Sequence, residues 1–370
     1  MEKPKLFEEK KEFFWTIFIL FLILLVRLGW EYRTYQEFIS KPFYFTEATV
    51  LNAYEKHKEK YRYQVLKLHD NTGHTFYTTT HRKDNLFKKT VRVQLFPDMR
   101  ITFWDYLGTF YVKSRIKYVQ KQPTSLAGIL HEKVASQHTL KSMQVFYSAI
   151  FFATPLSGVL REKVSLLGIS HLIALSGFHL GILWAIVYGL LLIPYRPLQQ
   201  YCFPYRFALI DIGIVSLLLI GLYVWFVGAP PSLLRAYVML LVGWVMLVLG
   251  LELLSFKFLF FVLFLLVMLV PSLLVSLGFW FSIIGVFYIY LLLYYAKGWS
   301  RWHIMLWIIP LGIFILMLPI VHTFFSATNP WQLISPLLSL LFIPFYPITI
   351  LLHLFGYGDI FDNALQWLFA

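Results

Sequence analysis

The sequence has little of what catalysis and redox chemistry need. Among its 370 residues there is one cysteine, Cys202, so neither an intramolecular disulfide nor a cysteine-rich metal site can form. Only 14% of the residues are charged, against about 25% in an average globular domain. No GxxxxGK[ST] phosphate loop, HExxH motif or HxHxD-type cluster occurs. We therefore expect no nucleotide motor, no nuclease, no metal and no other cofactor, and we do not expect an enzyme.

Acidic residues are nearly missing from the second half of the chain. Between Glu162 and Asp359 only Asp211 and Glu252 occur, although the whole chain carries a formal net charge of +13. A proton or cation route normally uses carboxylates inside the membrane. A route for a polyanion should avoid them, because like charges repel strongly at low dielectric. The pattern favours an anionic or a neutral substrate, and the basic balance suits anionic lipid as well as nucleic acid.

Long apolar runs take up most of the remaining sequence, which is 59% hydrophobic. A helix needs about 20 apolar residues to cross a bilayer, so these runs predict an α-helical polytopic membrane protein. No cleavable signal peptide is expected, because the first run contains Arg27 and lacks a small-residue cleavage site. The predicted spans are 13–29, 170–193, 207–226, 233–250, 256–270, 279–296, 302–321 and 332–355.

Residues 42–120 have a different, polar character. This segment contains five short alternating runs that predict the strands of a small barrel or sandwich. The runs are FYFTEATVLNAY, KYRYQVLKLHD, HTFYTTTH, TVRVQLF and MRITFWDYLGTF. Five such strands match an OB-like barrel, a scaffold that often holds single-stranded nucleic acid. Basic residues interleaved with aromatic ones suit backbone tracking and base stacking, although the aromatics of a small basic domain can also be plain core. The DNA-binding candidates are Lys67, Phe76, Tyr77, Arg82, Lys83, Lys88 and Lys89.

The composition divides the chain into six parts. We expect an inserted external OB-like domain between a first membrane helix and a membrane-embedded helical bundle. The predicted parts are a cytoplasmic leader at 1–12, the first transmembrane helix at 13–30, the β-barrel at 42–120, interfacial or re-entrant helices at 122–167, the bundle at 168–356 and a C-terminal tail at 357–370.

Lysine and arginine alternate between successive loops of the bundle. Under the positive-inside rule, the basic loops face the cytoplasm, so the N-terminus lies inside and the β module outside. The loops near 227–232, 271–278 and 322–331 contain neither lysine nor arginine. The basic loops hold Arg196, Arg206, Lys257, Lys297 and Arg301.

The stretch GISHLIALSGFHLG, residues 168–181, places polar groups at the start of an apolar helix. Polar residues in a span usually face a bundle interior or an aqueous path. Ser176 beside His179 also suggests a nucleophile and base, but no GxSxG elbow and no third carboxylate accompany them. His171 and His179 without carboxylates make a poor metal site. Close helix packing by Ser176 and Gly177 is the remaining alternative.

Four segments of the bundle resemble motifs of the ComEC family of inner-membrane DNA-import channels. HLIALSGFHLG is similar to that family's HLLAISGLHVG signature, and GAPPSLLRAYVM to its G-x-x-x-S-x-x-R-A-x-x-M element. VPSLLVSLGFWFS and SPLLSLLFIPFYP resemble two further segments. The sequence departs from the family pattern where Val270 replaces Asp, Trp280 replaces Gln and Ser339 replaces Asn.

The resemblance implies a channel for single-stranded DNA in natural transformation, located in the bacterial inner membrane. It also implies the lipid bilayer, a cytoplasmic helicase-like motor and an outer-face DNA receptor as partners, with one chain or a homodimer forming the pore. Many members carry a C-terminal metallo-β-lactamase-like domain, and we expect a short form without it. The channel candidates are His171, Ser176, Gly177, Phe178, His179, Ser232, Arg235, Phe279, Trp280 and Ser282.

Two other functions stay open at this stage. One is an intramembrane hydrolase that uses Ser176 and His179. The other is a transporter of a different anionic substrate, such as a lipid or polyphosphate head group.

Overall fold

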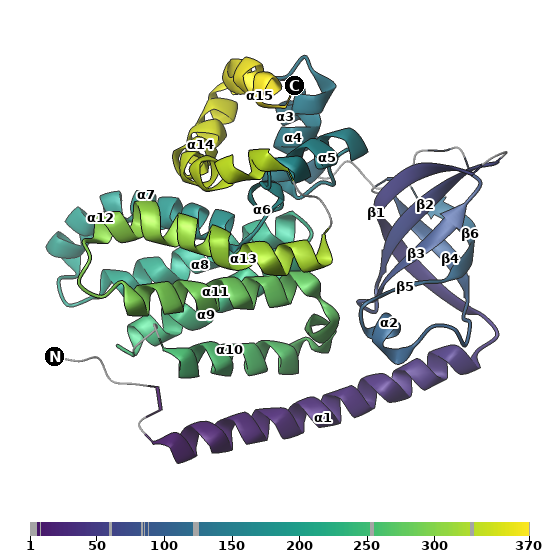
Figure 1. The fold of residues 1–370 in the computed structure, drawn as a ribbon, viewed down its shortest axis with the longest axis horizontal. Helices are drawn as coiled ribbons and strands as arrows, with labels where there is room; N and C mark the ends of the chain where they lie inside the picture. The colour runs from purple at the N-terminus through teal and green to yellow at the C-terminus, as the bar shows by residue number, and fades with distance from the viewer. Residues whose placement is uncertain are drawn as a thin grey trace. The chain divides into compact units, whose positions relative to one another are not determined.

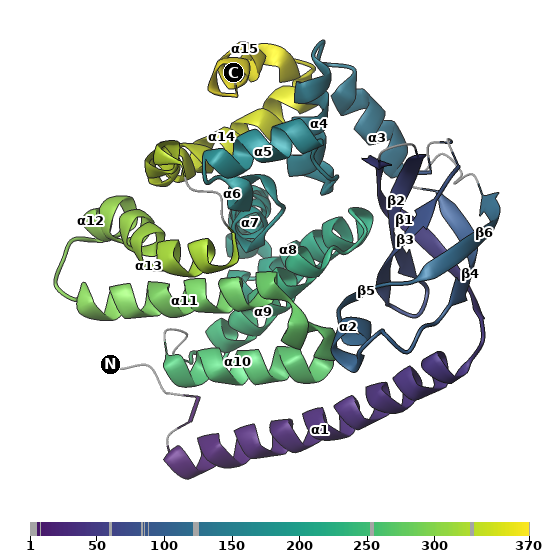
Figure 2. The ribbon, with the colours of Figure 1, turned by 45° about the vertical axis from the view of Figure 1, so that its right-hand side comes forward.

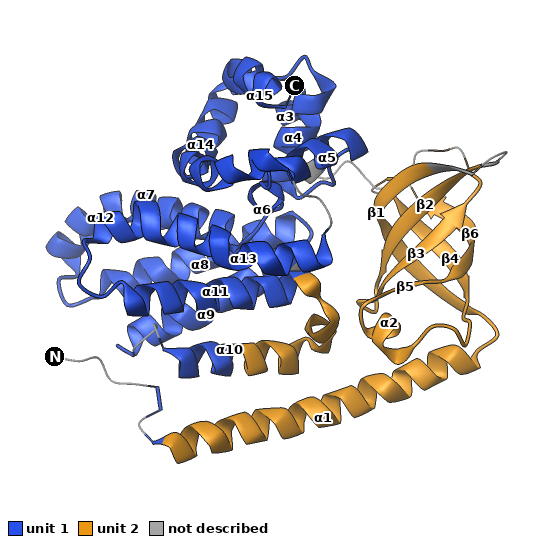
Figure 3. Ribbon diagram, in the orientation of Figure 1, with its two compact units in different colours: residues 1–9, 126–262, 278–370 blue, residues 10–125, 263–277 orange. Residues whose placement is uncertain are grey.

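A computed structural model describes residues 6–7, 9–58, 61–82, 84, 86–87, 89–120, 126–251, 255–325 and 329–369. The chain divides into two compact units (Figure 3). Unit 1 comprises residues 1–9, 126–262 and 278–370, and unit 2 comprises residues 10–125 and 263–277.

Unit 2 contains a long helix and a mixed β-sheet. Its helices in the chain up to residue 125 are α1 (Lys10–Ser40) and α2 (Phe103–Leu107). Its strands are β1 (Tyr44–Lys58), β2 (Tyr61–Asp70), β3 (Thr75–Thr80), β4 (Thr90–Phe96), β5 (Thr109–Tyr111) and β6 (Lys113–Gln120). The short η1 helix (Pro271–Val275) also belongs to this unit.

The sheet has the strand order β5-β3-β2-β1-β4-β6 (Figure 1). All neighbours are antiparallel except β3 and β5, which pair in parallel. β5 and β6 follow one another in the chain with only Val112 between them, yet they occupy the two ends of the strand order. Near this junction, Thr78 Oγ1 of β3 lies 2.7 Å from Ser114 Oγ of β6.

The expectation of a strand in MRITFWDYLGTF is wrong for most of that run. Four of the five predicted runs correspond to β1–β4, but the fifth contains helix α2 and ends in the short strand β5. The cause is a capping box: the Thr102 hydroxyl accepts a hydrogen bond from the Asp105 amide, and the Asp105 carboxylate accepts from the Thr102 amide. This box satisfies two amide groups that would otherwise lack partners at a helix start. The sixth strand, β6, was not anticipated.

The core of unit 2 forms between the sheet and the end of α1. Phe76 is 0% exposed there and stacks on Phe110 at 5.7 Å between ring centroids. Phe38 near the end of α1 packs against Tyr106 of α2, with 5.3 Å between ring centroids. Burial of such large side chains is worth about 1.5–3 kcal/mol each, so this cluster ties α1 to the sheet.

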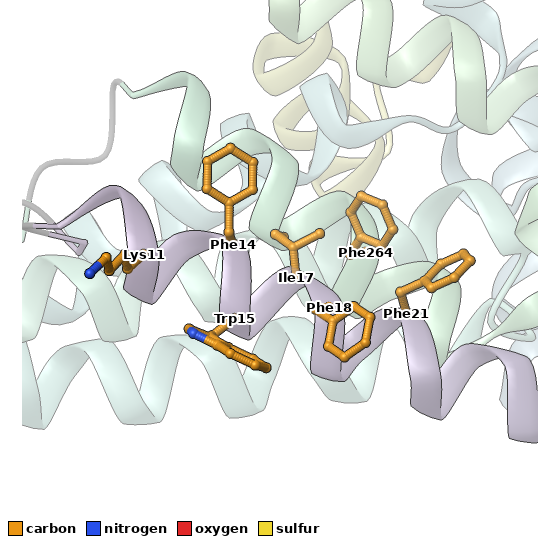
Figure 4. A pocket seen from close by; sticks show the side chains of 7 residues that line it. All are labelled: Lys11, Phe14, Trp15, Ile17, Phe18, Phe21 and Phe264. Atoms are coloured by element: carbon orange, nitrogen blue, oxygen red, sulfur yellow. The ribbon is translucent and has the colours of Figure 1, made fainter.

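Helix α1 has the properties of a membrane span. It contains 31 residues and is one of six helices in the described part of the chain that are long and apolar enough to cross a membrane. The predicted first span, 13–30, lies inside it. A groove of about 590 Å³ runs along it, and Figure 4 shows aromatic side chains lining that groove. The lining residues are Lys11, Phe14, Trp15, Ile17, Phe18, Phe21 and Phe264.

Unit 1 contains the remaining candidate spans. They are α7 (Gly177–Cys202), α8 (Ala208–Phe226), α11 (Leu277–Tyr295), the continuous segment 301–324 and the segment 330–355. Segment 301–324 consists of α12 (Arg301–His303), η2 (Ile304–Ile308) and α13 (Ile309–Phe324), and segment 330–355 of η3 (Pro330–Ile334) and α14 (Ser335–Phe355). Two predicted spans are shorter helices, α9 (Pro231–Val248) and α10 (Phe256–Leu269).

Short helices from the two ends of unit 1 pack together. In Figures 1 and 2, α3 (Leu126–Ala135), α4 (Lys141–Phe152) and α5 (Gly158–Leu166) lie beside α14 and α15 (Asp362–Leu368). A shared apolar cluster joins them, with Tyr147 of α4 and Tyr346 of α14 almost fully buried. The described part of the expected tail at 357–370 is therefore folded. It forms η4 (Gly358–Phe361) and α15, and Phe369 is buried in the same cluster.

Candidate functional site

The stretch 168–181 forms a short helix, a turn and the start of α7. Helix α6 covers Ser170–Ile173, and α7 begins at Gly177 with Ser176 as its N-cap. Ser176 and His179 form a capping box, because Nδ1 of His179 lies 3.3 Å from the Ser176 amide nitrogen and accepts its hydrogen bond. The Ser176 hydroxyl lies 3.2 Å from the same Nδ1. The local sequence thus uses both side chains to begin a helix.

The two histidines of this stretch have different surroundings. His179 is 0% exposed and packs edge-on against Phe342 and Tyr346 of α14, at 5.1 and 4.7 Å between centroids. Its Nε2 has no hydrogen-bond partner in the described part of the chain. His171 is exposed, with Nε2 3.4 Å from Ser339 Oγ. Phe178 is also exposed, with 40% of its surface accessible.

Helices α7 and α9 approach closely at the second motif. The Ser232 hydroxyl donates to the Leu175 carbonyl at 3.0 Å. A Cβ placed on Gly177 would lie 3.2 Å from the Ala236 Cβ, so glycine permits this approach. Gly177 therefore has the packing role expected of a small residue between membrane helices.

Arg235 connects the second motif with the third. Its guanidinium carbon lies 5.7 Å from the centre of the Phe279 ring, and a Cβ on Gly278 would lie 3.9 Å from both terminal guanidinium nitrogens. The side chain is half-buried, its Nε has no hydrogen-bond partner, and it makes no ion pair within the part of the chain that the structure describes. Such a cation is attracted to the aromatic face and keeps its charge available for an anion. Phe279 itself is buried, whereas Trp280 and Ser282 are exposed on α11.

The fourth motif packs against the first. The Ser335 hydroxyl, at the start of α14, donates to the Gly168 carbonyl at 3.2 Å. Gly168 has a φ of +69°, a left-handed conformation that glycine adopts at little cost. Together with the His171–Ser339 contact, this bond completes a chain of contacts through all four motif segments.

The β-module candidates do not all share one surface. Lys67 of β2 and Tyr77 of β3 are register partners, with the ammonium 5.8 Å from the ring centre. Phe76 points to the core, because neighbouring residues of a strand face opposite sides. Arg82 is exposed and Lys89 half-buried. Lys83 and Lys88 lie outside the described residues.

A buried polar cluster was not foreseen. Nδ1 of His138 lies 3.0 Å from both carboxylate oxygens of Asp362, and its Nε2 lies 3.0 Å from Nε2 of His353. His353 Nδ1 donates to the Thr349 carbonyl at 2.6 Å. More than 200 residues separate His138 from Asp362, so no local pattern links them. Within the described residues, no group of three or more His, Cys, Asp or Glu side chains could hold a metal ion.

Comparison with known proteins identifies a family. The model of a protein family described as Competence protein matches residues 155–366, more than half of the chain. Neither the curated proteins nor the solved structures contain a match. The matched region includes all four motif segments that contact one another in unit 1. The chain therefore belongs to the competence protein family, whose role is in DNA uptake.

Proposed function

We propose that this protein is a channel of the bacterial inner membrane that carries single-stranded DNA into the cytoplasm during natural transformation. Family membership supports a transport role in DNA uptake rather than catalysis. The observation that carries the proposal is the chain of contacts through the four motif segments. It includes Arg235, a cation that lies beside Phe279 and has no acidic partner among the described residues.

The charges around this point suit a polyanion. A half-buried guanidinium without a carboxylate beside it can donate to phosphate oxygens as they pass. Asp211, one of the two acids between Glu162 and Asp359, is already bound by Arg206 through two contacts of 2.6 and 2.7 Å. It therefore adds little repulsion along a path near Arg235. One free cation also holds phosphate weakly enough for a strand to keep moving.

The β module is the proposed receiver of the strand. The consecutive strands β5 and β6 occupy the two ends of the strand order, and the Thr78–Ser114 contact joins β3 to β6. These features support a closed, OB-like barrel, a scaffold that binds oligonucleotides. The driving force would come from a cytoplasmic helicase-like motor, and an outer-face receptor would deliver DNA to the module.

The loop charges support the orientation of this channel. Arg206 lies in the loop before α8 and Lys297 in the loop after α11, and the positive-inside rule assigns such loops to the cytoplasm. The N-terminus would then lie in the cytoplasm, and the β module would face the periplasm.

The geometry of Ser176 and His179 favours a structural role over the alternative hydrolase. A serine nucleophile needs a base that a third group orients. Nδ1 of His179 is instead occupied by the amide and the hydroxyl of Ser176, and its buried Nε2 has no partner in the described part of the chain. The capping box at the start of α7 therefore explains why both side chains lie where they do.

Uptake of labelled DNA by cells tests the proposal. Arg235→Ala should lower the amount of label that reaches the cytoplasm at least tenfold, with the protein still present in the membrane at wild-type level. Arg235→Lys should retain part of the import because it keeps the charge. Arg161→Ala, an exposed cation of α5, is the matched control and should import normally. Wild-type import by Arg235→Ala would remove this residue from the path, and unchanged transformation in a strain lacking the whole protein would favour transport of another anion.

A further inference from the structure

Strand β6 carries a row of cations that the sequence did not single out. Lys113, Arg115 and Lys117 are exposed, and Arg92 of the neighbouring strand β4 is exposed in register with Tyr118. None of these four cations makes an ion pair with a described residue. Lys113 and Arg115 lie two positions apart, which is about 6.8 Å along an extended strand. Lys117 lies at a register shift between β4 and β6. The row therefore offers several separate positive charges at this edge of the strand order.

A groove adjoins this row. It has a volume of about 430 Å³ and lies where the end of β3 meets β6. Arg115 belongs both to the groove and to the row of cations. Three residues with hydroxyl groups and two arginines are among its lining residues, so several possible donors for an anion lie close together there. The lining residues are Thr79, Thr80, His81, Arg82, Ser114, Arg115 and Ile116.

Exposed aromatic rings accompany the charges. Tyr118 is 64% exposed on β6, Phe96 is 38% exposed on the adjacent strand β4, and Phe45 is 45% exposed on β1, the strand beyond β4. An exposed ring on a folded sheet can stack with a nucleic-acid base without first leaving a core. One acid, Glu47, lies in register with Arg92, so the charge of this face is strongly but not wholly positive.

We propose that this surface binds the phosphodiester backbone of single-stranded nucleic acid. The groove between β3 and β6 receives a phosphate between Arg82 and Arg115, the β6 cations and Arg92 follow the adjoining backbone, and Tyr118 stacks with a base. The choice of ligand rests on the proposed function, whereas the location rests on the groove and the unpaired charges.

Two comparisons favour this surface and this ligand. The Lys67–Tyr77 pair on β2 and β3 offers one ammonium, and burial lowers the pKa of that ammonium below its ordinary value of 10.5. The β6 surface offers several exposed cations instead. An anionic lipid surface would need only the charges, and would leave the hydroxyl-lined groove and the exposed Tyr118 without a role.

Binding of a labelled oligothymidylate to the full chain in detergent, followed by fluorescence anisotropy, tests the proposal. Log K falls with log salt by about 0.7 for each phosphate that a protein neutralises on a single strand. The double variant Arg115→Gln/Lys117→Gln should therefore reduce the slope by about 1.4 and raise Kd at least tenfold at low salt. Tyr118→Leu should raise Kd at least fivefold without changing the slope. Lys133→Gln/Arg161→Gln, in α3 and α5, is the control and should leave both values unchanged.

The outcomes separate this proposal from the proposed function. DNA import by Arg235→Ala tests the channel, and oligonucleotide binding by the β6 double variant tests this surface. If the β6 double variant, with an unchanged unfolding temperature, also binds like wild type, the surface is not the binding site while the channel proposal stands. If the wild-type chain binds vesicles rich in phosphatidylglycerol but not oligothymidylate, the β6 surface is a lipid contact and the inference is overturned.

Discussion

The hydroxyl of Ser232 donates a 3.0 Å hydrogen bond to the carbonyl of Leu175, and this bond joins α9 to the turn before α7. Leu175 is buried in the turn before α7, and a buried carbonyl without a hydrogen-bond partner costs about 1–3 kcal/mol. The bond holds the first motif against the second. It therefore also sets where the next turn of α9 places Arg235.

The close approach of α7 and α9 predicts that Gly177→Val disrupts the site. The new side chain would meet the Ala236 Cβ, 3.2 Å from the ideal Cβ position, and overpacking of this kind costs about 1–3 kcal/mol. We expect a lower unfolding temperature in detergent and reduced DNA import. Gly181→Ala is the matched control, because nothing lies within 4 Å of a Cβ at Gly181. Equal behaviour of the two variants would show that α7 and α9 do not need glycine at this contact.

The capping box predicts that Ser176 acts through structure and not as a nucleophile. Ser176→Ala should lower stability by about 1 kcal/mol, because the helix start loses its side-chain acceptor. Ser176→Asn keeps an acceptor at the N-cap and removes the hydroxyl. We therefore expect Ser176→Asn to match wild type in both unfolding temperature and DNA import. Loss of import in Ser176→Asn, together with normal stability, would instead revive the hydrolase hypothesis.

The sequence was sufficient to predict much of the fold but not the facing of individual side chains. Apolar run length located six of the eight predicted spans at described helices that are long and apolar enough to cross a bilayer, whereas 233–250 and 256–270 correspond to shorter helices. The alternating pattern located β1–β4. Phe76 and Tyr77 are both aromatic neighbours on one strand, so the pattern could not predict that Phe76 is the one that faces the core. Within residues 99–110 the alternating pattern predicted a strand, but the capping box of Thr102 and Asp105 begins helix α2 there instead.

Contacts between distant segments account for most of what the sequence left hidden. The four motifs predicted which residues form the candidate site, and the structure shows that the motif segments contact one another. The sequence did not predict that His179 is buried against α14. The His138 cluster depends on residues from both ends of unit 1, and neither end carries a recognisable motif. The interfacial character expected of 122–167 likewise did not reveal that α4 packs on α14.

The His138–Asp362 contact predicts that the C-terminal segment depends on a buried carboxylate. Asp362→Asn removes the charge that faces His138 and should destabilise unit 1 by about 3 kcal/mol, the cost of breaking a buried pair. Thermal unfolding of the solubilised protein measures the effect. Asp359→Asn, an exposed acid three residues earlier, is the control and should unfold like wild type. An unchanged unfolding temperature in Asp362→Asn would mean that the apolar cluster alone holds α15.

Tyr106 predicts how the stability of unit 2 varies at alkaline pH. Its ring is almost fully buried, its hydroxyl lies 3.1 Å from His74 Nε2, and burial raises its pKa well above the ordinary value of 10.0, with the charges of Glu31 and Asp70 adding to the effect. The unfolded chain therefore loses this proton at a lower pH than the folded chain. Between the ordinary and the raised pKa, stability must fall as pH rises.

The measurement compares the unfolding temperatures of wild type, Tyr106→Phe and Tyr118→Phe from pH 9 to pH 11. Phenylalanine at position 106 keeps the packing against Phe38 and Phe110 but has no proton to lose. Tyr106→Phe should start slightly below wild type, because it loses the contact with His74, and should then decline less steeply above pH 10. Tyr118→Phe, altered at an exposed ring, should follow the wild-type curve. Parallel curves for wild type and Tyr106→Phe would show that this phenol does not couple folding to pH.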